Sequence, residues 1–335
     1  MTTDHLAAVL AFDGGGSKTD VALVAADGSL LATARGPGSN ADLTGRDQAI
    51  AVLAELAAKV AAQAGLAGGG PLAVHTSACL AGADLPEEEA ELGALIKAQG
   101  WSASSTVVND TFAVLRAGLG DTGDHWGIAV VCGQGINCVG VAPDGRTTRF
   151  LALGPISGDW GGGSEIGLEA LRWAIRAEDG RGPQTELRTA VAAHFGLPRV
   201  EDVVTGIHLG RIDYSALHGL VPLLFKIAGG GDEVARSVVF RQAEEICLMV
   251  TAAARKLDLD ADLAVPVVLG GSLMTARDPL LSAAIRDGLL AALPAADIRT
   301  VDVPPVAGAA LLGLDYVGVP ASALTRLRES AAATW

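Results

Sequence analysis

Residues 10–24, LAFDGGGSKTDVALV, combine the side chains and backbone that phosphate binding requires. An apolar run ends at Asp13, glycines fill positions 14–16, and Ser17 and Lys18 precede a second apolar run. Glycines let backbone approach a ligand closely, and successive N–H groups in such a turn form an anion-binding concavity. Mg²⁺ prefers few carboxylates plus phosphate oxygens, so Asp13 is a candidate ligand. The stretch predicts two strands joined by a nucleotide phosphate loop; the alternative is an ordinary hairpin with a loose turn.

The composition is that of a two-domain globular chain. Its 335 residues exceed what one core usually holds and suggest two domains of ~150 residues. Hydrophobic residues make up 50% and aromatic residues only 4%, so the core must consist largely of Ala, Val, Leu and Gly. The formal net charge of −14 argues against nucleic-acid binding. An anionic ligand must therefore be captured by local groups rather than by the overall field.

Cysteine usage and hydropathy predict a cytoplasmic protein. Cys79, Cys132, Cys138 and Cys247 form no CxxC or Cys/His cluster, so a structural zinc site is not expected. The sequence shows no signal peptide, and no apolar run approaches the ~20 residues that span a bilayer. We therefore expect reduced thiols and no membrane partner.

The first 118 residues alternate strands and helices in the order βββαβαβα. After the first hairpin, strands are expected at 29–34, 72–77 and 105–108, and helices at 46–65, 86–100 and 111–117. The dipeptide Asp27-Gly28 is a favoured tight turn and joins the second strand to the third.

A second glycine-looped hairpin follows the first at a fixed distance. Strands are expected at 127–132 and 138–141, joined by the loop GQGIN, and a third strand runs on to Ala152. The Asp-Gly turns that begin at Asp27 and Asp144 are 117 positions apart, as are the last glycine of the first loop and the first glycine of the second. The recurrence predicts two like domains that face each other across a cleft; the alternative is chance recurrence of a common hairpin.

The remainder of the chain is predicted to be mainly helical. Two further strands are expected at 266–269 and 298–301. Helices are expected at 165–178, 185–195, 215–228, 232–257, 279–293, 306–314 and 322–333.

Three glycine loops and four further motifs reveal a resemblance. The loops FDGGGSKTD, CGQGINC and VVLGGSL resemble the two phosphate loops and the adenosine loop of the sugar kinase/actin/Hsp70 ATPase fold. Gly-Ser-Asn at 38–40, Asn-Asp at 109–110, the segment 135–138 and GDWGGG at 158–163 make the chain similar to the N-acetylglucosamine kinase branch, which is grouped with the BadF/BadG/BcrA/BcrD-type ATPases. The resemblance covers nearly the whole chain, to about Leu314.

The fold that this resemblance implies is α/β, with two similar actin-like ATPase (ribonuclease H-like) domains facing a central cleft. Residues 1–118 would form the N-terminal domain. Residues 119–321 would form the C-terminal domain with helical insertions, and the terminal helix at 322–335 would pack back on the first domain.

The activity that the resemblance implies is ATP-dependent phosphorylation of the 6-hydroxyl of an amino sugar, with N-acetylglucosamine the first choice. Asp110 would be the general base, since a carboxylate within hydrogen-bond reach can orient a sugar hydroxyl and accept its proton. The alternative for Asp110 is a helix N-cap ahead of Thr111. Asn40, Asn137 and Asp159, with Asp110, would hydrogen-bond the sugar; turn or cap roles are the alternatives for Asn40 and Asp159.

The resemblance also implies ATP and Mg²⁺ in the cleft. Asp13 would hold the Mg²⁺ through water. For Gly270, Gly271 and Ser272 the alternative is a plain strand-to-helix turn. The full set of residues expected to bind the nucleotide is Gly14, Gly15, Gly16, Ser17, Lys18, Gly133, Gln134, Gly135, Gly270, Gly271 and Ser272.

Two departures from the family pattern leave other sugars open. Gln134 stands where the family usually carries Thr or Ser, and Trp160 stands where many members carry Glu. Glucosamine or another hexose is therefore an alternative acceptor. An ATPase that activates a radical enzyme through an iron–sulfur cluster is a second alternative, although the four cysteines form no cluster-like loop. A sugar sensor is disfavoured because no basic helix is present. A homodimer is among the expected assemblies.

Overall fold

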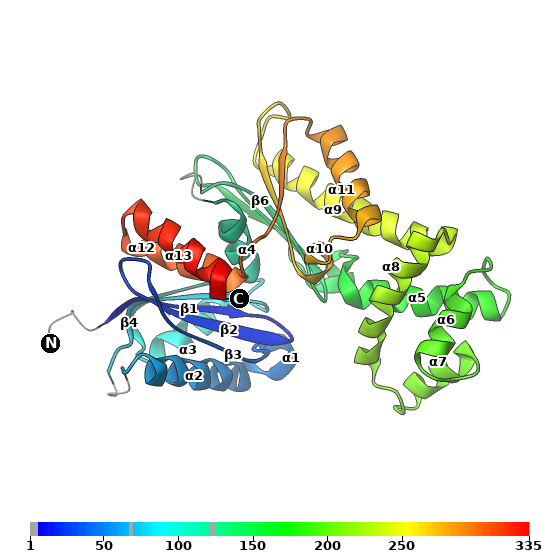
Figure 1. Ribbon diagram of the computed structural model, residues 1–335, viewed down its shortest axis with the longest axis horizontal. Helices are drawn as coiled ribbons and strands as arrows, with labels where there is room; N and C mark the ends of the chain where they lie inside the picture. Colours follow the sequence, from blue (N-terminus) through cyan, green and yellow to red (C-terminus); the bar gives the residue numbers. More distant parts are fainter. Residues whose placement is uncertain (1–5, 67–69, 121–124, 335) are drawn as a thin grey trace.

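Two five-stranded sheets organise the chain (Figure 1). The structure is a computed structural model that describes residues 6–66, 70–120 and 125–334. The strands of the first sheet are β1 (Ala7–Gly14), β2 (Lys18–Val24), β3 (Leu30–Pro37), β4 (Ala73–Leu80) and β5 (Ser102–Asn109). Those of the second are β6 (Gly127–Cys132), β7 (Ile136–Val141), β8 (Thr147–Arg149), β9 (Pro266–Gly270) and β10 (Asp297–Thr300).

The two sheets have the same topology. Their strand orders are β3-β2-β1-β4-β5 and β8-β7-β6-β9-β10. In each sheet the three hairpin strands pair antiparallel, and the two remaining strands continue parallel to the first. This duplication confirms the predicted fold class and the interpretation of the 117-residue recurrence.

The Asp-Gly turns are equivalent in the two sheets. Gly28 and Gly145 have φ of 84° and 85°, a left-handed conformation that glycine adopts without steric cost. Asp27 accepts a hydrogen bond from the Ser29 N–H at 2.9 Å, and Asp144 accepts one from the Arg146 N–H at 3.0 Å. Each turn therefore positions the third strand of its hairpin.

Helices cover both sheets and form an insertion in the second half. The insertion comprises α5 to α8, which extend away from the second sheet (Figure 1). The helices of the first half are α1 (Ala41–Thr44), α2 (Arg46–Gln63), α3 (Pro86–Ala98) and α4 (Asp110–Gly118). The others are α5 (Gly162–Glu178), α6 (Leu187–His194), α7 (Val200–His208), α8 (Leu220–Gly230), α9 (Glu233–Lys256), α10 (Ser272–Thr275), α11 (Pro279–Ala292), α12 (Pro305–Val317) and α13 (Ala321–Thr334).

Two predicted elements differ in the structure, and some short helices were not predicted. The strand expected to reach Ala152 ends at Arg149. The helix expected at 215–228 is divided into a 3₁₀ turn, Tyr214–Gly219, and α8. Helix α7 was not predicted, because its nine residues follow Pro198 and give a short periodic pattern.

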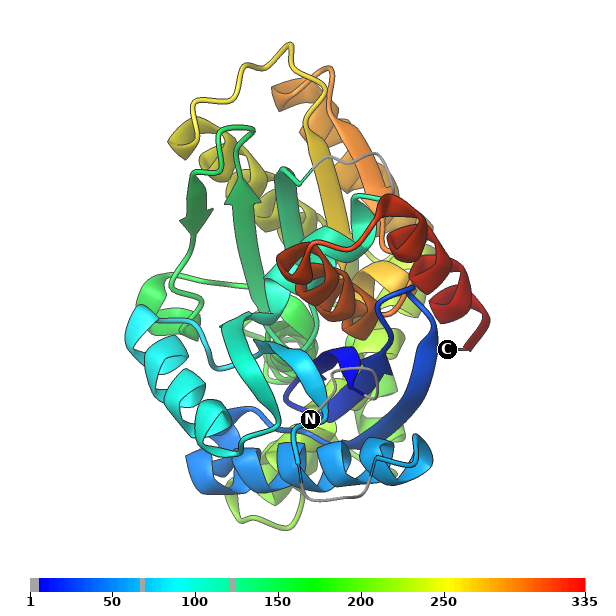
Figure 2. The same ribbon diagram turned by 90° about the vertical axis from the view of Figure 1, so that its left-hand side faces the viewer.

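The last two helices return to the N-terminal half. Helix α12 packs on β1 and β4 (Figure 2). Leu327 of α13 lies in a buried cluster with residues of β1 and α12. Helices α2 and α3 cover the opposite face of this sheet. We therefore propose that residues 305–334 belong with residues 1–118 in one domain, and that the intervening segment forms the other.

Helices α4 and α12 cross in close contact where the two halves meet. A Cβ on Gly308 would lie 1.9 Å from the carbonyl oxygen of Ala113, so only glycine permits this approach. Arg116 of α4 donates to Asp315 of α12 at 2.7 Å, and its side chain is almost fully buried. Because α4 also packs on β6 and β9 while α12 packs on β1 and β4, this crossing links the two sheets.

We predict that Gly308→Ala destabilises the protein, because the added methyl overlaps backbone that cannot move without separating α4 from α12. Overpacking of this kind costs about 1–3 kcal/mol or more. Gly93→Ala in α3 is the matched control, since its Cβ meets only an ordinary 3.9 Å contact. Removing that helix-interior glycine should stabilise by about 0.5–1 kcal/mol. Urea unfolding of both variants measures the difference, and equal effects would contradict the prediction.

Candidate active site

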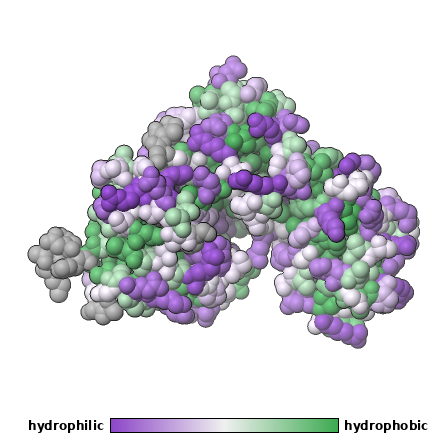
Figure 3. Space-filling view, in the orientation of Figure 1, coloured by the Kyte–Doolittle hydropathy of each residue, from purple (hydrophilic) through white to green (hydrophobic). Residues whose placement is uncertain are grey.

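The surface is hollowed between the N-terminal half and the helices of the second half (Figure 3). Part of this hollow is a cleft of about 380 Å³ at the carboxyl ends of β1, β4 and β5. Asp13 lies near the end of β1, Asp84 follows β4, and Asp110 follows β5, so parallel strands deliver three carboxylates to one edge.

Among the described helices, none is long and apolar enough to cross a membrane.

The first glycine loop leaves two backbone donors free. Within the loop, the Gly15 N–H donates to the Lys18 carbonyl at 2.9 Å, and the Gly15 carbonyl accepts from the Ser39 N–H at 3.0 Å. The N–H groups of Gly16 and Ser17 have no acceptor among the residues that the structure describes. The loop is thus held in shape while two donors stay available at the cleft.

The second glycine loop has the same property. Its carbonyls at Gly133 and Gln134 accept from the N-terminal turn of α5, at 2.9 Å each. The N–H groups of Gln134 and Gly135 have no acceptor within the described part of the chain. Four free amide donors on facing loops therefore line one cleft, an arrangement that suits phosphate groups.

Lys18 lines the cleft but is already paired. Its Nζ lies 3.0 Å from Asp20 Oδ2, and Arg35 binds the same carboxylate at 2.6 Å. Asp20 is fully buried, so the two cations compensate its charge. Lys18 remains half exposed and keeps donors for a ligand, because an ammonium group has three.

The third glycine loop opens toward a second cavity. Ser272 lines both the cleft and an adjoining cavity of about 790 Å³, which also shares Gly133 and Gln134 with the cleft. Val221 and Phe225 give this cavity an apolar wall. The cavity has the size and the lining that a nucleoside requires next to a phosphate site.

Two of the predicted nucleotide residues do not line the cleft. A Cβ on Gly14 would lie 2.4 Å from Ser39 Oγ, and a Cβ on Gly270 would lie 2.4 Å from Val114 Cγ1. Both glycines therefore permit close packing behind the loops. The predicted residues that do line it are Asp13, Gly15, Gly16, Ser17, Lys18, Asn40, Asp110, Gly133, Gln134, Gly135, Asn137, Gly271 and Ser272.

Asp110 is not the N-cap of its helix. Asn109 has that role, because its Oδ1 accepts from the Thr111 N–H at 3.0 Å. The Asp110 side chain lines the cleft. Burial raises the pKa of Asp110 to about 6, while the backbone N–H groups of Thr111 and of Asp110 itself lower it. Near neutral pH the group can accept a proton.

Asp13 lies in the cleft near several charged side chains. Burial raises its pKa to about 7, and the negative charges of Asp110 and Asp20 add to the effect. No hydrogen bond satisfies its carboxylate within the described residues, which also contain no group of three or more His, Cys, Asp or Glu that could hold a metal. A single open carboxylate suits a hydrated Mg²⁺ that phosphate oxygens also bind.

The three predicted sugar-binding residues besides Asp110 are placed differently from one another. Asn40 caps α1 through a 2.8 Å bond from the Asp42 N–H, and it lines the cleft with its amide nitrogen unpaired within the described chain. Asn137 lines the cleft, but its side chain is hydrogen-bonded within the protein. Asp159 accepts a hydrogen bond from Ser157 and lines two side cavities rather than the cleft itself.

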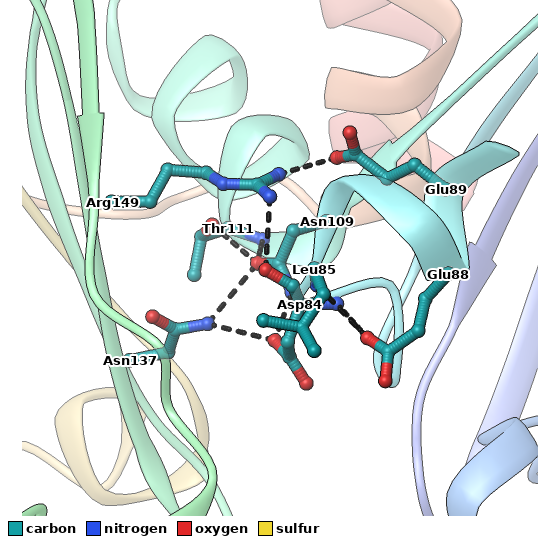
Figure 4. A network of polar contacts seen from close by, with 8 residues as sticks. All are labelled: Asp84, Leu85, Glu88, Glu89, Asn109, Thr111, Asn137 and Arg149. Carbon is teal, nitrogen blue, oxygen red and sulfur yellow. Dashed lines mark hydrogen bonds and ion pairs between the residues drawn. The ribbon is translucent and has the colours of Figure 1, made fainter. Parts of the chain in front are cut away.

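Asp84 is a cleft residue that sequence reasoning missed. Its Oδ1 accepts from Asn109 Nδ2 at 2.7 Å and from Asn137 Nδ2 at 3.3 Å (Figure 4). Burial raises the pKa of Asp84 to about 7, with contributions from nearby carboxylates that Arg149 partly offsets. The available signal was its place a few residues beyond a buried strand, next to the strands that carry Asp13 and Asp110.

The two departures from the family pattern have structural explanations. The Arg241 guanidinium lies 3.9 Å from the ring centroid of Trp160, which packs against the core of the second half. A Cβ on Gly16 would lie 2.5 Å from Gln134 Oε1, so the Gln134 side chain reaches across the cleft to the first loop. Trp160 therefore serves packing, and Gln134 brings the two phosphate-type loops into contact.

Two duplicated halves around such a cleft define the actin-like ATPase fold. The chain belongs to the BadF/BadG/BcrA/BcrD ATPase family, whose profile matches residues 11–313.

Curated relatives match most of the chain. An N-acetyl-D-glucosamine kinase of Dictyostelium discoideum is 28% identical over 91% of this chain and 97% of its own length. An N-acetylmuramic acid/N-acetylglucosamine kinase of Clostridium acetobutylicum is 29% identical over 78% of this chain and 84% of its own.

Solved structures share the fold. A Chromobacterium violaceum structure, provisionally assigned as an N-acetylglucosamine kinase, superposes with a TM-score of 0.70 and 25% identity, over 92% of this chain and 99% of that one. The ROK hexokinase of Thermus thermophilus has a TM-score of 0.52 and 18% identity, over 91% and 97% respectively, and supports the fold alone.

We predict that Asp110→Asn raises the melting temperature at pH 8. The folded-state pKa of about 6 lies above the ordinary 3.8, so the folded chain holds this proton more tightly than the unfolded chain does. The stability that the protonated Asp110 contributes is fully present below about pH 4 and is lost as pH rises through 6. At pH 8 the wild-type chain therefore carries an unfavourable buried charge. Calorimetry should show a higher melting temperature for Asp110→Asn than for wild type at pH 8, and a smaller difference between the two at pH 4.5. A lower melting temperature at pH 8 would contradict this account.

Proposed function

We propose that this chain is an ATP-dependent kinase that phosphorylates the 6-hydroxyl of an amino sugar, N-acetylglucosamine before others. The observation that carries the proposal is that Asp110 lines the same cleft as four unpaired loop amides. Family membership and the names of both curated relatives support the assignment.

The proposed mechanism divides the work between the two halves. The free N–H groups of Gly16, Ser17, Gln134 and Gly135 bind phosphate oxygens, while the adjoining 790 Å³ cavity takes the nucleoside. Asp110 orients the acceptor hydroxyl and takes its proton as the phosphoryl group is transferred. Closing the cleft excludes water and limits wasteful hydrolysis.

A magnesium ion fits the donor set on the first half. Asp13 would hold it, and the ion would neutralise charge on the transferring phosphoryl group. The open carboxylate and its raised pKa both indicate a position that a cation stabilises.

The cysteines favour a kinase over an iron–sulfur activator. Cys79, Cys132 and Cys138 are fully buried, Cys247 is partly buried, and all four are free thiols. A cluster shared between subunits needs thiolates at the surface. Free thiols also support the expected cytoplasmic setting. The homodimer stays a prediction.

A second candidate acceptor is an amino sugar with an acidic substituent, such as N-acetylmuramic acid. A side cavity of about 530 Å³ is lined by Arg149 and Lys256 as well as by Asp84 and Asp159. Lys256 lies 4.4 Å from the ring centroid of Phe150 and has no carboxylate partner within the described residues. A cation without a carboxylate partner beside the proposed sugar site favours a carboxylate on the substrate.

The acceptor is tested by coupled ADP release with Mg-ATP. The panel is N-acetylglucosamine, N-acetylmuramic acid, glucosamine, N-acetylmannosamine, glucose and no sugar. We expect strong dependence on N-acetylglucosamine, while preference for N-acetylmuramic acid would select the second candidate. Sugar-independent release, or none, would overturn the kinase proposal.

We predict that Asp110→Asn lowers turnover by roughly 10²–10⁴-fold, the usual contribution of a general base. Affinities for ATP and sugar should stay within a few-fold, because Asn keeps the size and a hydrogen-bonding oxygen. Single-turnover kinetics and calorimetric binding separate the two effects. Asp47→Asn, an exposed substitution on α2, is the control and should retain full activity. Near-normal turnover of Asp110→Asn would remove Asp110 from its role.

A further inference from the structure

We propose that Asp84 is a sugar-binding residue whose Oδ2 accepts a hydrogen bond from a ring hydroxyl of the acceptor, while Asn109 and Asn137 hold its other oxygen. The proposal rests on the proposed kinase function and extends it to the residue that selects the acceptor.

The place of Asp84 in the cleft suits this role. Among the described residues it is the one that lines both the central cleft, which holds Asp110, and the 530 Å³ side cavity. An acceptor whose 6-hydroxyl reaches Asp110 would extend its ring toward one of these two spaces. Asp84 lies at the junction between them.

One oxygen of Asp84 is occupied and the other is available. Oδ1 accepts from Asn109 Nδ2 at 2.7 Å and from Asn137 Nδ2 at 3.3 Å, whereas Oδ2 has no partner in the described part of the chain (Figure 4). Pairs of bonds on one oxygen fix the plane of the carboxylate. The free oxygen is therefore preorganised to bind a ligand hydroxyl.

The backbone at Asp84 is held from both halves. Its N–H donates to Glu88 Oε2 at 2.9 Å, and its carbonyl accepts from the Arg149 guanidinium at 2.9 Å (Figure 4). Arg149 belongs to β8 and also pairs with Glu89 of α3. Because Arg149 comes from the second half, Asp84 is fully positioned only when the halves are together.

Asn137 acts in this network as a positioning residue. Its Oδ1 accepts from the Cys138 N–H at 2.7 Å, and its Nδ2 donates to Asp84 Oδ1 and Asn109 Oδ1 at 3.3 Å each. Both amide hydrogens and the oxygen are thus engaged within the protein. Asn137 can influence sugar binding through Asp84 without touching the sugar.

The experiment compares Asp84→Asn with wild type in steady-state kinetics. Asn keeps an acceptor for Asn109 but replaces the free oxygen with a donor. Losing a hydrogen bond to a charged acceptor should raise the sugar KM about ten- to a hundredfold, with the ATP KM changed less than threefold. Glu87→Gln is the matched control, because it also removes one negative charge and Glu87 is an exposed residue in the same segment. A sugar KM within twofold of wild type would overturn the proposal.

A substrate series separates direct contact from a structural effect. Wild type should discriminate strongly against one monodeoxy analogue of the acceptor, because a site built for a hydroxyl rejects the analogue that lacks it. Asp84→Asn should no longer discriminate against that analogue, and it should discriminate against the other monodeoxy analogues as wild type does. Unchanged discrimination, or equal increases in the KM for ATP and for sugar, would assign Asp84 a structural role and overturn the proposal.

A double-mutant cycle tests the part of Asn137. Asn137→Ala should raise the sugar KM, and adding Asp84→Asn should produce little further loss, since both changes disable one contact. Additive losses would contradict the positioning role. If wild type shows no sugar-dependent ADP release, the proposed function itself fails, an outcome distinct from normal kinetics in the Asp84 variant.

Discussion

Crowding of three carboxylates at one sheet edge is the constraint on which the rest of this structure depends. Asp13, Asp84 and Asp110 line one cleft, and burial raises the pKa of each well above its ordinary value. Such an arrangement is unfavourable for folding, so the surroundings must compensate it. Asparagine side chains hold Asp84, backbone amides at the start of α4 face Asp110, and Asp13 stays open to a cation.

The second half completes what the first cannot supply alone. Its glycine loop presents two further amide donors, and Asn137 and Arg149 reach across to Asp84. The glycine contact between α4 and α12 joins a helix that packs on the second sheet to one that packs on the first. The proposed site is thus formed by both copies of a duplicated unit, and neither copy contains it alone.

The sequence predicted the framework better than the details of the cleft. Both hairpins were predictable, because apolar runs, glycine loops and Asp-Gly turns recur at a constant spacing. Asp84 was missed because it lies in an irregular segment directly before a helix start and carries no periodic signal. The engagement of Asn137 and the packing of Gly14 and Gly270 depend on contacts between residues far apart in the chain, which local patterns do not encode.

In the proposed reaction the phosphoryl group goes to a sugar hydroxyl rather than to water. The most direct measurement is ³¹P NMR of a reaction containing the protein, Mg-ATP and N-acetylglucosamine. We expect one new phosphomonoester signal, coupled to the two protons on C6, in amounts equal to the ADP formed. Inorganic phosphate as the product in place of that ester would contradict the proposed function.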